Sequence, residues 1–423
     1  MMIFGRSKKE EETYGREATV FLGGMLEDAS EKVFLDVNRS HIVVISGKRG
    51  YGKSYTMGVL AEGILHLPYD LRRKVSVVVI DTMGVYWPMK KPNTEEQETL
   101  DKWDLEPLPF DVEILYPQGL ERYYSDASLK SFFDGGFVIK PAELTADSWY
   151  YLLGIDENQA SAVIVRRIVQ ELKQQKGQYY GIDEMIEIAE KQGKANFSAV
   201  NAVINRLEHI KSMGVFHRRG QNIEDIVKPG QVTIIDTSLF SGQARGWTMR
   251  EVLVGLLART IFRKRMEARK KEEAAELLKL DKSTEFPLVW MMIDEAHQFV
   301  PSQRTTAATN VLIDWVRQGR QPGLSLVLAT QRPGRLHSDV LSQCDILISH
   351  RLTAAQDIRE IDEKISQTYV TEGRFNVLSD YINSLPKNPG YAVILDDLTE
   401  TVQRIAVRPR QGKHGGETAK LIG

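Results

Sequence analysis

Eight consecutive residues, Gly47-Lys48-Arg49-Gly50-Tyr51-Gly52-Lys53-Ser54, match the pattern of a phosphate-binding loop. Such a loop needs a strand before it and a helix after it. An apolar run at residues 42–45 precedes it, and a helical pattern at residues 55–64 follows it. The alternative, a glycine-rich turn without a ligand, would not require both flanks. The pattern therefore predicts an α/β fold with a nucleotide site where this strand meets its helix.

The chemistry of the loop follows from its residue types. Glycines allow successive backbone N–H groups to approach phosphate oxygens, and the start of the helix adds partial positive charge. We expect Lys53 to reach the β- and γ-phosphates and Ser54 to give a hydroxyl ligand to Mg²⁺. The predicted cofactors are ATP and Mg²⁺, and the expected nucleotide-binding residues are Gly47, Lys48, Arg49, Gly50, Tyr51, Gly52, Lys53, Ser54 and Tyr55.

A second apolar run, residues 288–293, ends in Asp294 and Glu295. We expect Asp294 to hold the Mg²⁺ shell and Glu295, one residue further on, to orient and deprotonate an attacking water. The adjacent second carboxylate favours hydrolysis over a nucleotide-exchange switch. The alternative is a strand followed by an acidic helix cap, which would leave Lys53 without its metal partner.

The next buried run, residues 324–328, leads to Gln331 and Arg332 at the same predicted edge of the sheet. Ligands of open α/β sheets bind at this edge, so Gln331 is a candidate γ-phosphate sensor, or alternatively a polar strand cap. Arg320 lies on the turn before the run and is either an arginine finger for a neighbouring subunit or a solvated loop charge. Arg332 and Arg351 are weaker candidates for the finger.

Two further residues lie close to these motifs. Asp81 ends the run at residues 75–80 and either supports the attacking water or caps the following segment; we favour capping. His297 follows Glu295 by two positions. Because no His, Cys or Asp spacing typical of a metal site surrounds it, we interpret His297 as a core or surface histidine.

The order of the apolar runs predicts a mostly parallel sheet with helices on both faces, because strands and helical patterns alternate. The runs after residue 74 are 75–80, 112–115, 232–235, 288–293, 324–328 and 346–349. We expect a frayed tail (1–14) and a short β segment within 1–40, two parts of the core at 41–140 and 228–388, an all-helical insertion at 141–227, and a β-rich segment with a basic tail at 389–423.

The charge balance limits how the chain meets nucleic acid. Its 55 Lys and Arg residues are matched by 57 Asp and Glu residues, so a general polyanion-coating role has no support and any DNA surface must be local. The basic stretch 263–271 is either such a contact or a solvated helix face. The lone Cys344, the absence of an apolar leader and the short apolar runs predict a cytoplasmic protein without a membrane span.

Taken together, the motifs resemble those of the HerA family of hexameric DNA-translocating ATPases, within the HerA and FtsK group of RecA-like P-loop motors. The resemblance covers most of the chain from Arg39 onward and is carried by residues 47–54, 293–297, 319–333, 341–345, 407–410 and 414–416. It implies a RecA-like core, a homo-oligomeric ring of six subunits, ATP sites at subunit interfaces and double-stranded DNA in the channel. It also implies a nuclease of the NurA type or another effector as partner.

One departure from the family concerns the start of the chain. HerA proteins usually carry a β-barrel before the phosphate loop, whereas only residues 1–46 precede it here, so we expect a few strands and no full barrel. The leading hypothesis is an ATP-driven translocase or helicase of duplex DNA. The alternatives are a ring-forming regulatory ATPase that controls a protein effector without moving along DNA, and a packaging or conjugation motor.

Overall fold

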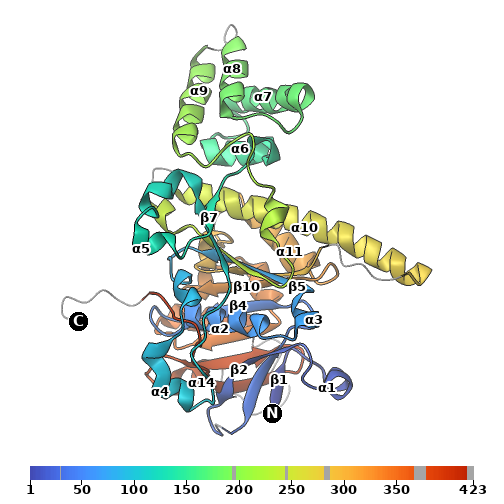
Figure 1. Ribbon diagram of the computed structural model, residues 1–423, viewed down its shortest axis with the longest axis vertical. Helices are drawn as coiled ribbons and strands as arrows, with labels where there is room; N and C mark the ends of the chain where they lie inside the picture. Colours follow the sequence, from blue (N-terminus) through green and yellow to red (C-terminus); the bar gives the residue numbers. More distant parts are fainter. Residues whose placement is uncertain (29, 193–196, 243–245, 281–285, 366–377, 417–423) are drawn as a thin grey trace, which may run out of the picture.

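One continuous sheet organises the molecule (Figure 1). The computed structural model describes residues 1–28, 30–192, 197–242, 246–280, 286–365 and 378–416. In this part of the chain thirteen strands are joined in the order β1-β3-β2-β13-β12-β11-β4-β10-β9-β5-β8-β6-β7. The strands are β1 (Met2–Phe4), β2 (Thr19–Met25), β3 (Lys32–Asp36), β4 (Ile42–Ser46), β5 (Val75–Asp81), β6 (Glu113–Pro117), β7 (Gly135–Phe137), β8 (Val232–Asp236), β9 (Leu288–Ile293), β10 (Leu324–Thr330), β11 (Ile346–His350), β12 (Tyr391–Asp396) and β13 (Thr401–Val407).

The eight strands from β11 to β7 in this order are all parallel to one another. This confirms the predicted mostly parallel sheet. All carboxyl ends of these strands meet at one edge, and the phosphate loop follows β4 near the middle of the row. The strand β7 was not predicted, because its residues Gly135, Gly136 and Phe137 carry almost no β-forming side chains.

Two hydrophobic cores cover the two faces of the sheet. Side chains alternate between the faces along a strand, so Val43 and Ile45 of β4 pack in one core while Ile42 and Val44 pack in the other. The first core contains α2 and the N-terminal strands, and the second contains most of the other helices. The helices are α1 (Lys8–Tyr14), α2 (Lys53–Leu65), α3 (Tyr69–Arg72), α4 (Gln97–Asp101), α5 (Ala127–Lys130), α6 (Ala146–Leu153), α7 (Ala160–Lys176), α8 (Ile182–Lys191), α9 (Phe197–Ser212), α10 (Gly246–Leu278), α11 (Thr309–Gln318), α12 (Ser338–Ser342), α13 (Ala355–Ile365) and α14 (Leu378–Ser384).

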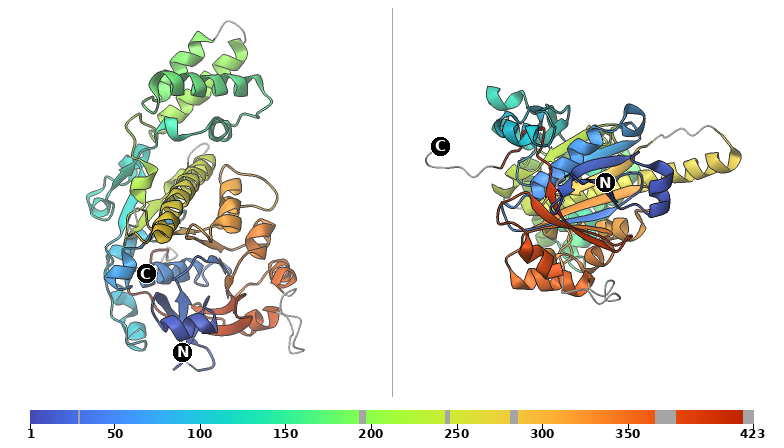
Figure 2. Two further views of the ribbon diagram at one scale, coloured as in Figure 1. Left: turned by 90° about the vertical axis from the view of Figure 1, so that its right-hand side faces the viewer. Right: turned by 90° about the horizontal axis from the view of Figure 1, so that it is seen from below.

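The helices α6 to α9 lie between β7 and β8 in the chain and form a lobe at one end of the molecule, opposite the N-terminal strands (Figures 1 and 2). They lie within residues 141–227, where the sequence predicts an all-helical insertion, and that division of the chain stays a prediction. The chain enters and leaves the lobe side by side, where Ile139 forms a parallel bridge with Phe216. The boundaries at residues 141 and 227 stay predictions.

The prediction of a frayed tail at residues 1–14 is wrong. Strand β1 pairs in parallel with β3, and Phe4 is buried. Helix α1 begins with a reciprocal cap between Ser7 and Glu10. The buried guanidinium of Arg6 binds the carboxylate of Asp36. The polar composition of this segment hid an ordered structure, because its order depends on a partner in β3.

At the other end of the chain, within the segment predicted to be β-rich, β12 and β13 form an antiparallel pair. They do not form an edge, because β12 also pairs with β11 and β13 also pairs with β2. The C-terminal strands thus connect the parallel core to the N-terminal strands. Arg408 and Arg410, expected as part of a basic tail, are buried. The part of the predicted tail beyond residue 416 lies outside the described residues.

Helix α10 contains the basic stretch at residues 263–271. The side chain of Arg265 is buried and donates from Nε to the carbonyl oxygen of Pro322 at 2.6 Å. Arg269 pairs with Glu273 on the same helix at 3.0 Å. Part of the basic stretch therefore serves packing and intrahelical pairing. Among the described helices, none combines the length and the apolar character required to cross a bilayer.

Candidate active site

The phosphate loop connects β4 to α2 and packs against the side chain of His350, the last residue of β11. Gly52, which precedes the helix, has a φ of 111°, in the left-handed region that favours glycine. A Cβ on Gly47 would come within 2.7 Å of the Cβ of His350. Burial lowers the pKa of His350 to about 4, so its ring is neutral. Nδ1 donates to the carbonyl oxygen of Tyr391 at 2.9 Å, and Nε2 accepts from Thr56 Oγ1 at 2.9 Å. A neutral, buried histidine therefore packs against the phosphate loop and holds it in place.

Lys53 is buried and its Nζ donates to the carbonyl oxygen of Lys48 at 3.3 Å, across the loop. Burial lowers the pKa of Lys53, while the carboxylates of Glu295 and Asp294 oppose this shift. The lysine thus stands inside the loop, between its backbone and the acidic end of β9. This is the position from which an ammonium group can contact phosphate oxygens.

Ser54 and Asp294 meet directly. The hydroxyl of Ser54 donates to Asp294 Oδ2 at 2.6 Å, which joins the first turn of α2 to the end of β9. Asp294 is fully buried, and this burial raises its pKa. A hydroxyl and a carboxylate are the hard oxygen ligands that Mg²⁺ prefers. The two side chains therefore fit the expected metal position, with the loop beside it.

Glu295 adopts a left-handed backbone conformation, with φ 50° and ψ 43°, which is uncommon for a residue with a side chain. Such strain persists only where the surroundings impose it, and it clusters at functional sites. The carboxylate of Glu295 accepts a hydrogen bond from Gln331 Nε2. His297 lies 3.4 Å from the same carboxylate and 3.1 Å from Thr330 Oγ1. Burial and the nearby Arg332 and Arg335 lower the pKa of His297 to about 4.

A row of three aspartates lies at the carboxyl ends of β9, β5 and β8: Asp294 follows β9, and Asp81 and Asp236 are the last residues of β5 and β8. Asp81 and Asp236 are register partners, and Ile80 and Ile293 pair just before Asp81 and Asp294. Burial and the adjacent Asp236 raise the pKa of Asp81 to about 8. Asp236 was missed by sequence reasoning, although it ends a buried strand as Asp81 and Asp294 do.

Asp81 accepts hydrogen bonds from the backbone N–H groups of Met83, Gly84 and Tyr86 at 3.1, 2.7 and 3.0 Å. It therefore caps the turn after β5, as the capping interpretation expects. The turn places Tyr86, whose hydroxyl donates to the carbonyl oxygen of Ser54 at 3.0 Å. Tyr86 was not singled out from the sequence, because its contact with α2 is tertiary.

The predicted residues fall into two groups. Lys53, Ser54, Asp294, Glu295 and Gln331 lie together at the carboxyl edge of the sheet. Arg320 does not join them: it precedes β10, at the opposite edge, where its carbonyl oxygen lies 3.5 Å from Ser40 Oγ. Arg332 lies on the active edge, and the carbonyl oxygen of Arg351 accepts from Lys48 N at 3.0 Å.

The fold and the site together define a P-loop ATPase with a RecA-like core. The chain belongs to the HerA helicase family: the family model described as "Helicase HerA, central domain" matches residues 20–251. A second model, described as "Zonular occludens toxin (Zot)", matches residues 253–372, a smaller part of the chain.

The curated relatives described next are archaeal proteins that align over nearly the whole chain at low identity. The DNA double-strand break repair helicase HerA of Pyrococcus furiosus is 23% identical over 467 residues, covering 97% of this chain and 74% of its own length. A probable helicase of Methanocaldococcus jannaschii is 24% identical over 421 residues, covering 95% of this chain and 69% of its own length.

Solved structures share the fold at still lower identity. VirB4 of Thermoanaerobacter pseudethanolicus has a TM-score of 0.57 and 13% identity, covering 93% of this chain and 96% of that one. The bacterial conjugative coupling protein TrwB has a TM-score of 0.55 and 12% identity, covering 98% and 91%. These likenesses agree with the predicted RecA-like fold class.

Proposed function

We propose that this protein is a ring-forming, Mg²⁺-dependent ATPase that moves along or unwinds double-stranded DNA. The observation that carries the proposal is the hydrogen bond between Ser54 and Asp294, followed by Glu295 in its strained conformation. It gathers the metal ligands, the phosphate loop and a second carboxylate at one edge of the sheet. A nucleotide switch would not need the second carboxylate.

Each side chain has a distinct role in the proposed reaction. Lys53 neutralises charge on the β- and γ-phosphates, and Ser54 and Asp294 would hold Mg²⁺, which supplies electrostatic stabilisation of the phosphates when bound. Glu295 orients an attacking water and accepts its proton. Gln331 holds the Glu295 carboxylate and is placed to respond when the γ-phosphate leaves.

A ring is supported by the position of Arg320. Phosphoryl transfer in such ATPases commonly uses an arginine from a neighbouring subunit, worth about a thousandfold or more in rate. Arg320 lies at the edge of the sheet away from its own phosphate loop, so an arginine finger at this position would act on the site of another subunit. Six subunits and a DNA-filled channel are the arrangement that the HerA family implies.

The DNA part of the proposal is supported by the printed functions of the relatives, two of which are a DNA double-strand break repair helicase and a probable helicase. With a formal net charge of -2, the chain would hold DNA through local basic groups that contact phosphates, without reading bases. A nuclease or other effector is the proposed protein partner.

The test measures ATP hydrolysis with and without linear duplex DNA. We expect DNA to stimulate hydrolysis, and Glu295→Gln to reduce it by about a hundredfold or more while ATP still binds. Glu98→Gln, the same change at an exposed position of α4, is the matched control and should keep full activity. Native mass measurement with ATP analogue and DNA reports the ring.

Two results would contradict the proposal. Hydrolysis that is indifferent to duplex DNA, together with an effector whose activity follows the ATP state, would favour the regulatory ATPase instead. A protein that remains monomeric under every condition would remove the role of Arg320 in a neighbouring site.

A further inference from the structure

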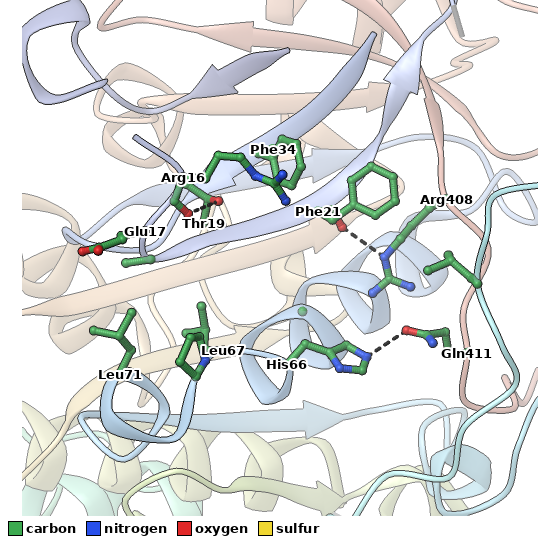
Figure 3. Close-up of a pocket in the computed structure, with 14 residues that line it drawn as sticks. Arg16, Glu17, Thr19, Phe21, Phe34, His66, Leu67, Leu71, Arg408 and Gln411 are labelled. Carbon is green, nitrogen blue, oxygen red and sulfur yellow. Dashed lines mark hydrogen bonds between the residues drawn. The ribbon is translucent and has the colours of Figure 1, made fainter. Parts of the chain in front are cut away.

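We propose that the cavity between the C-terminal end of α2 and strand β2 binds a small organic anion with an apolar body, whose charged group is held by Arg408. The cavity measures about 700 Å³ and lies at the end of α2 that is remote from the phosphate loop (Figure 3). Among the described residues that line it, none belongs to the phosphate site. The inference therefore stands apart from the proposed ATPase function.

The walls of the cavity are mostly apolar. The side chains of Phe21 and Phe34 lie on one side, with their ring centroids 5.3 Å apart (Figure 3). Leu67, Leu71 and Leu105 also line the cavity. Small-molecule sites typically have volumes of about 300–1,000 Å³ and apolar walls with a few polar groups that fix the ligand. The volume and the walls therefore fit a ligand with an apolar body of two or three rings.

The buried polar group that such a ligand would meet is the guanidinium of Arg408, a residue that is 2% exposed. Its Nε donates to the carbonyl oxygen of Phe21 at 3.0 Å. Nη1 donates to Glu62 at 3.1 Å and to the carbonyl oxygen of Pro409 at 2.9 Å, and Nη2 donates to that of Val59 at 3.2 Å. A guanidinium has five N–H groups, and the fifth, on Nη2, has no acceptor in the described part of the chain. A buried donor without an acceptor is unfavourable, so a ligand oxygen would satisfy it.

The charge around Arg408 points to an anion. Arg408 and Arg410 are both buried and share the carboxylate of Glu62, at 3.1 and 2.9 Å. Within the described contacts no other carboxylate pairs with either of them, so two guanidinium groups and one carboxylate leave one positive charge in excess. A buried charge without a counter-ion is costly. Arg410 lies 6.0 Å from the ring of Tyr86 and does not line the cavity, whereas Arg408 does.

A second cation lies at the mouth of the cavity. The exposed guanidinium of Arg16 stands 4.6 Å from the ring centroid of Phe34. Glu17 is the acidic side chain among the described residues of the lining, against the two cations Arg16 and Arg408. Arginine is well suited to bind carboxylate, sulfonate or phosphate oxygens. The lining therefore combines an apolar body site with an excess of positive charge.

The imidazole of His66 adds no charge to the cavity. Burial lowers the pKa of His66, so the ring is neutral. Its Nε2 donates to Gln411 Oε1 at 2.8 Å, and the ring meets the ring of Phe110 edge-on, with centroids 5.3 Å apart. These contacts fix the ring. The attraction for an anion therefore comes from the two guanidinium groups.

Occupancy of the cavity would act on α2. Arg408 binds the carbonyl oxygen of Val59 and the carboxylate of Glu62, and both residues belong to this helix. The helix begins at Lys53, the lysine of the phosphate loop. An anion held by Arg408 would therefore stabilise the packing of the helix that follows the loop.

The experiment compares two fluorescent probes with the same aromatic body. Anilinonaphthalene sulfonate is an anion, and N-phenylnaphthylamine lacks the sulfonate. We expect the parent protein to bind the sulfonate at least about tenfold more tightly than the neutral amine, because a hydrogen bond to a charged group contributes affinity of this order. Arg408→Met should bring the two affinities within about twofold of each other. This change leaves Glu62 with Arg410 alone, so the charges of the cluster are balanced.

Two further variants locate the site. Leu71→Trp, which fills the cavity, should weaken both probes about tenfold or more. Its control is Tyr69→Trp, which places the same side chain at an exposed position of α3 outside the lining and should keep both affinities.

Arg16→Gln should weaken only the sulfonate, by about threefold. The same change at the exposed Arg73, which does not line the cavity, should have no effect. Thermal unfolding checks that each variant is folded at the temperature of the measurement. If Arg408→Met or Leu71→Trp does not fold, Arg16→Gln and its control decide.

Equal affinities of the parent for the two probes would overturn the inference, because the cavity would then accept an apolar body without regard to charge. Unchanged binding in the folded Leu71→Trp variant would also overturn it, since the probe would then lie elsewhere on the protein. A parent that binds neither probe would leave the cavity without the proposed ligand class.

Discussion

The amide of Gln331 donates a hydrogen bond to the carboxylate of Glu295, and this bond joins the ends of the neighbouring strands β10 and β9. Glu295 is held in a left-handed conformation at the same point. The amide therefore fixes the direction of a carboxylate whose backbone is already strained. A change at either residue should alter the position of the attacking water more than the binding of phosphates.

For Gln331→Ala we expect the rate of ATP cleavage to fall by about tenfold to a hundredfold, with ATP affinity changed by less than about threefold. The amide contacts the proposed base and not the loop, which is the reason for this split. Single-turnover cleavage and equilibrium binding measure the two quantities separately. A large loss of affinity with an unchanged cleavage rate would contradict the assignment of Gln331.

For Arg320 the prediction concerns mixed rings. Arg320→Ala and Lys53→Ala should each lose hydrolysis by about a thousandfold, because one removes the cation given to a neighbour and the other removes the loop lysine. Mixing the two inactive proteins should restore part of the activity, since some interfaces then combine an intact Lys53 with an intact Arg320.

The matched control for this experiment is Arg317→Ala, because Arg317 is exposed, lies three residues away and pairs with Asp339. Its activity should stay close to that of the parent. If the mixed samples exchange subunits and still remain as inactive as the separate variants, Arg320 is a solvated loop charge and not an arginine finger.

Glu62→Gln should destabilise the protein by about 3–5 kcal/mol, because it removes the only carboxylate bound to the buried guanidinium groups of Arg408 and Arg410 in the described contacts. Urea denaturation measures the loss. Glu27→Gln is the comparison: Glu27 pairs with Arg404 at the surface, and its loss should cost less than about 1 kcal/mol. Equal effects of the two changes would show that the buried ion pairs of Glu62 contribute no more to stability than the surface pair of Glu27.

Folding stability should fall at alkaline pH because of His41. Burial opposes protonation of this ring, but hydrogen bonds to Asp345 and Asp36, at 2.6 and 3.1 Å, raise the pKa of His41 from 6.5 to about 9. A pKa that is higher in the folded state gives stability that is complete below pH 6.5 and is lost as the pH rises through about 9. The loss should be on the order of 3 kcal/mol.

Denaturation at several pH values between 6 and 10 tests this expectation, with His41→Asn as the variant whose profile should be flatter over the same range. His209→Asn, a change at an exposed histidine of α9, should keep the profile of the parent. Identical profiles for His41→Asn and the parent would exclude His41 as the source of the pH dependence.

The central part of the fold could be predicted because its signals are local. A buried run, a glycine-rich loop and a helix start follow one another around Lys53, and the run that ends in Asp294 and Glu295 is equally direct. The rule that carboxyl ends of parallel strands meet at one edge then brings Gln331 to the same place. These inferences need only the order of the elements.

The rest depends on partners that are distant in the chain. The sequence suggests an exposed basic ending for Arg408 and Arg410, but in the described part of the chain both guanidinium groups pair with the buried carboxylate of Glu62, 346 positions before Arg408. Arg6 depends in the same way on Asp36, which is why residues 1–14 looked unstructured. Tyr86 belongs to none of the motifs, and its place near Ser54 follows from tertiary packing alone.

The position of β13 between β2 and β12 has a consequence for synthesis of the chain. The first strands pack on α2, but their strand pairing with the rest of the sheet runs through β13. This pairing cannot form until residues 401–407 have emerged from the ribosome, after nearly the whole of translation. Such non-local pairing makes folding slow. Residues 408–412, which bind Glu62 of α2, emerge just after these residues. A nascent protein that stalls before them therefore lacks the contacts that hold this segment against the helix after the phosphate loop.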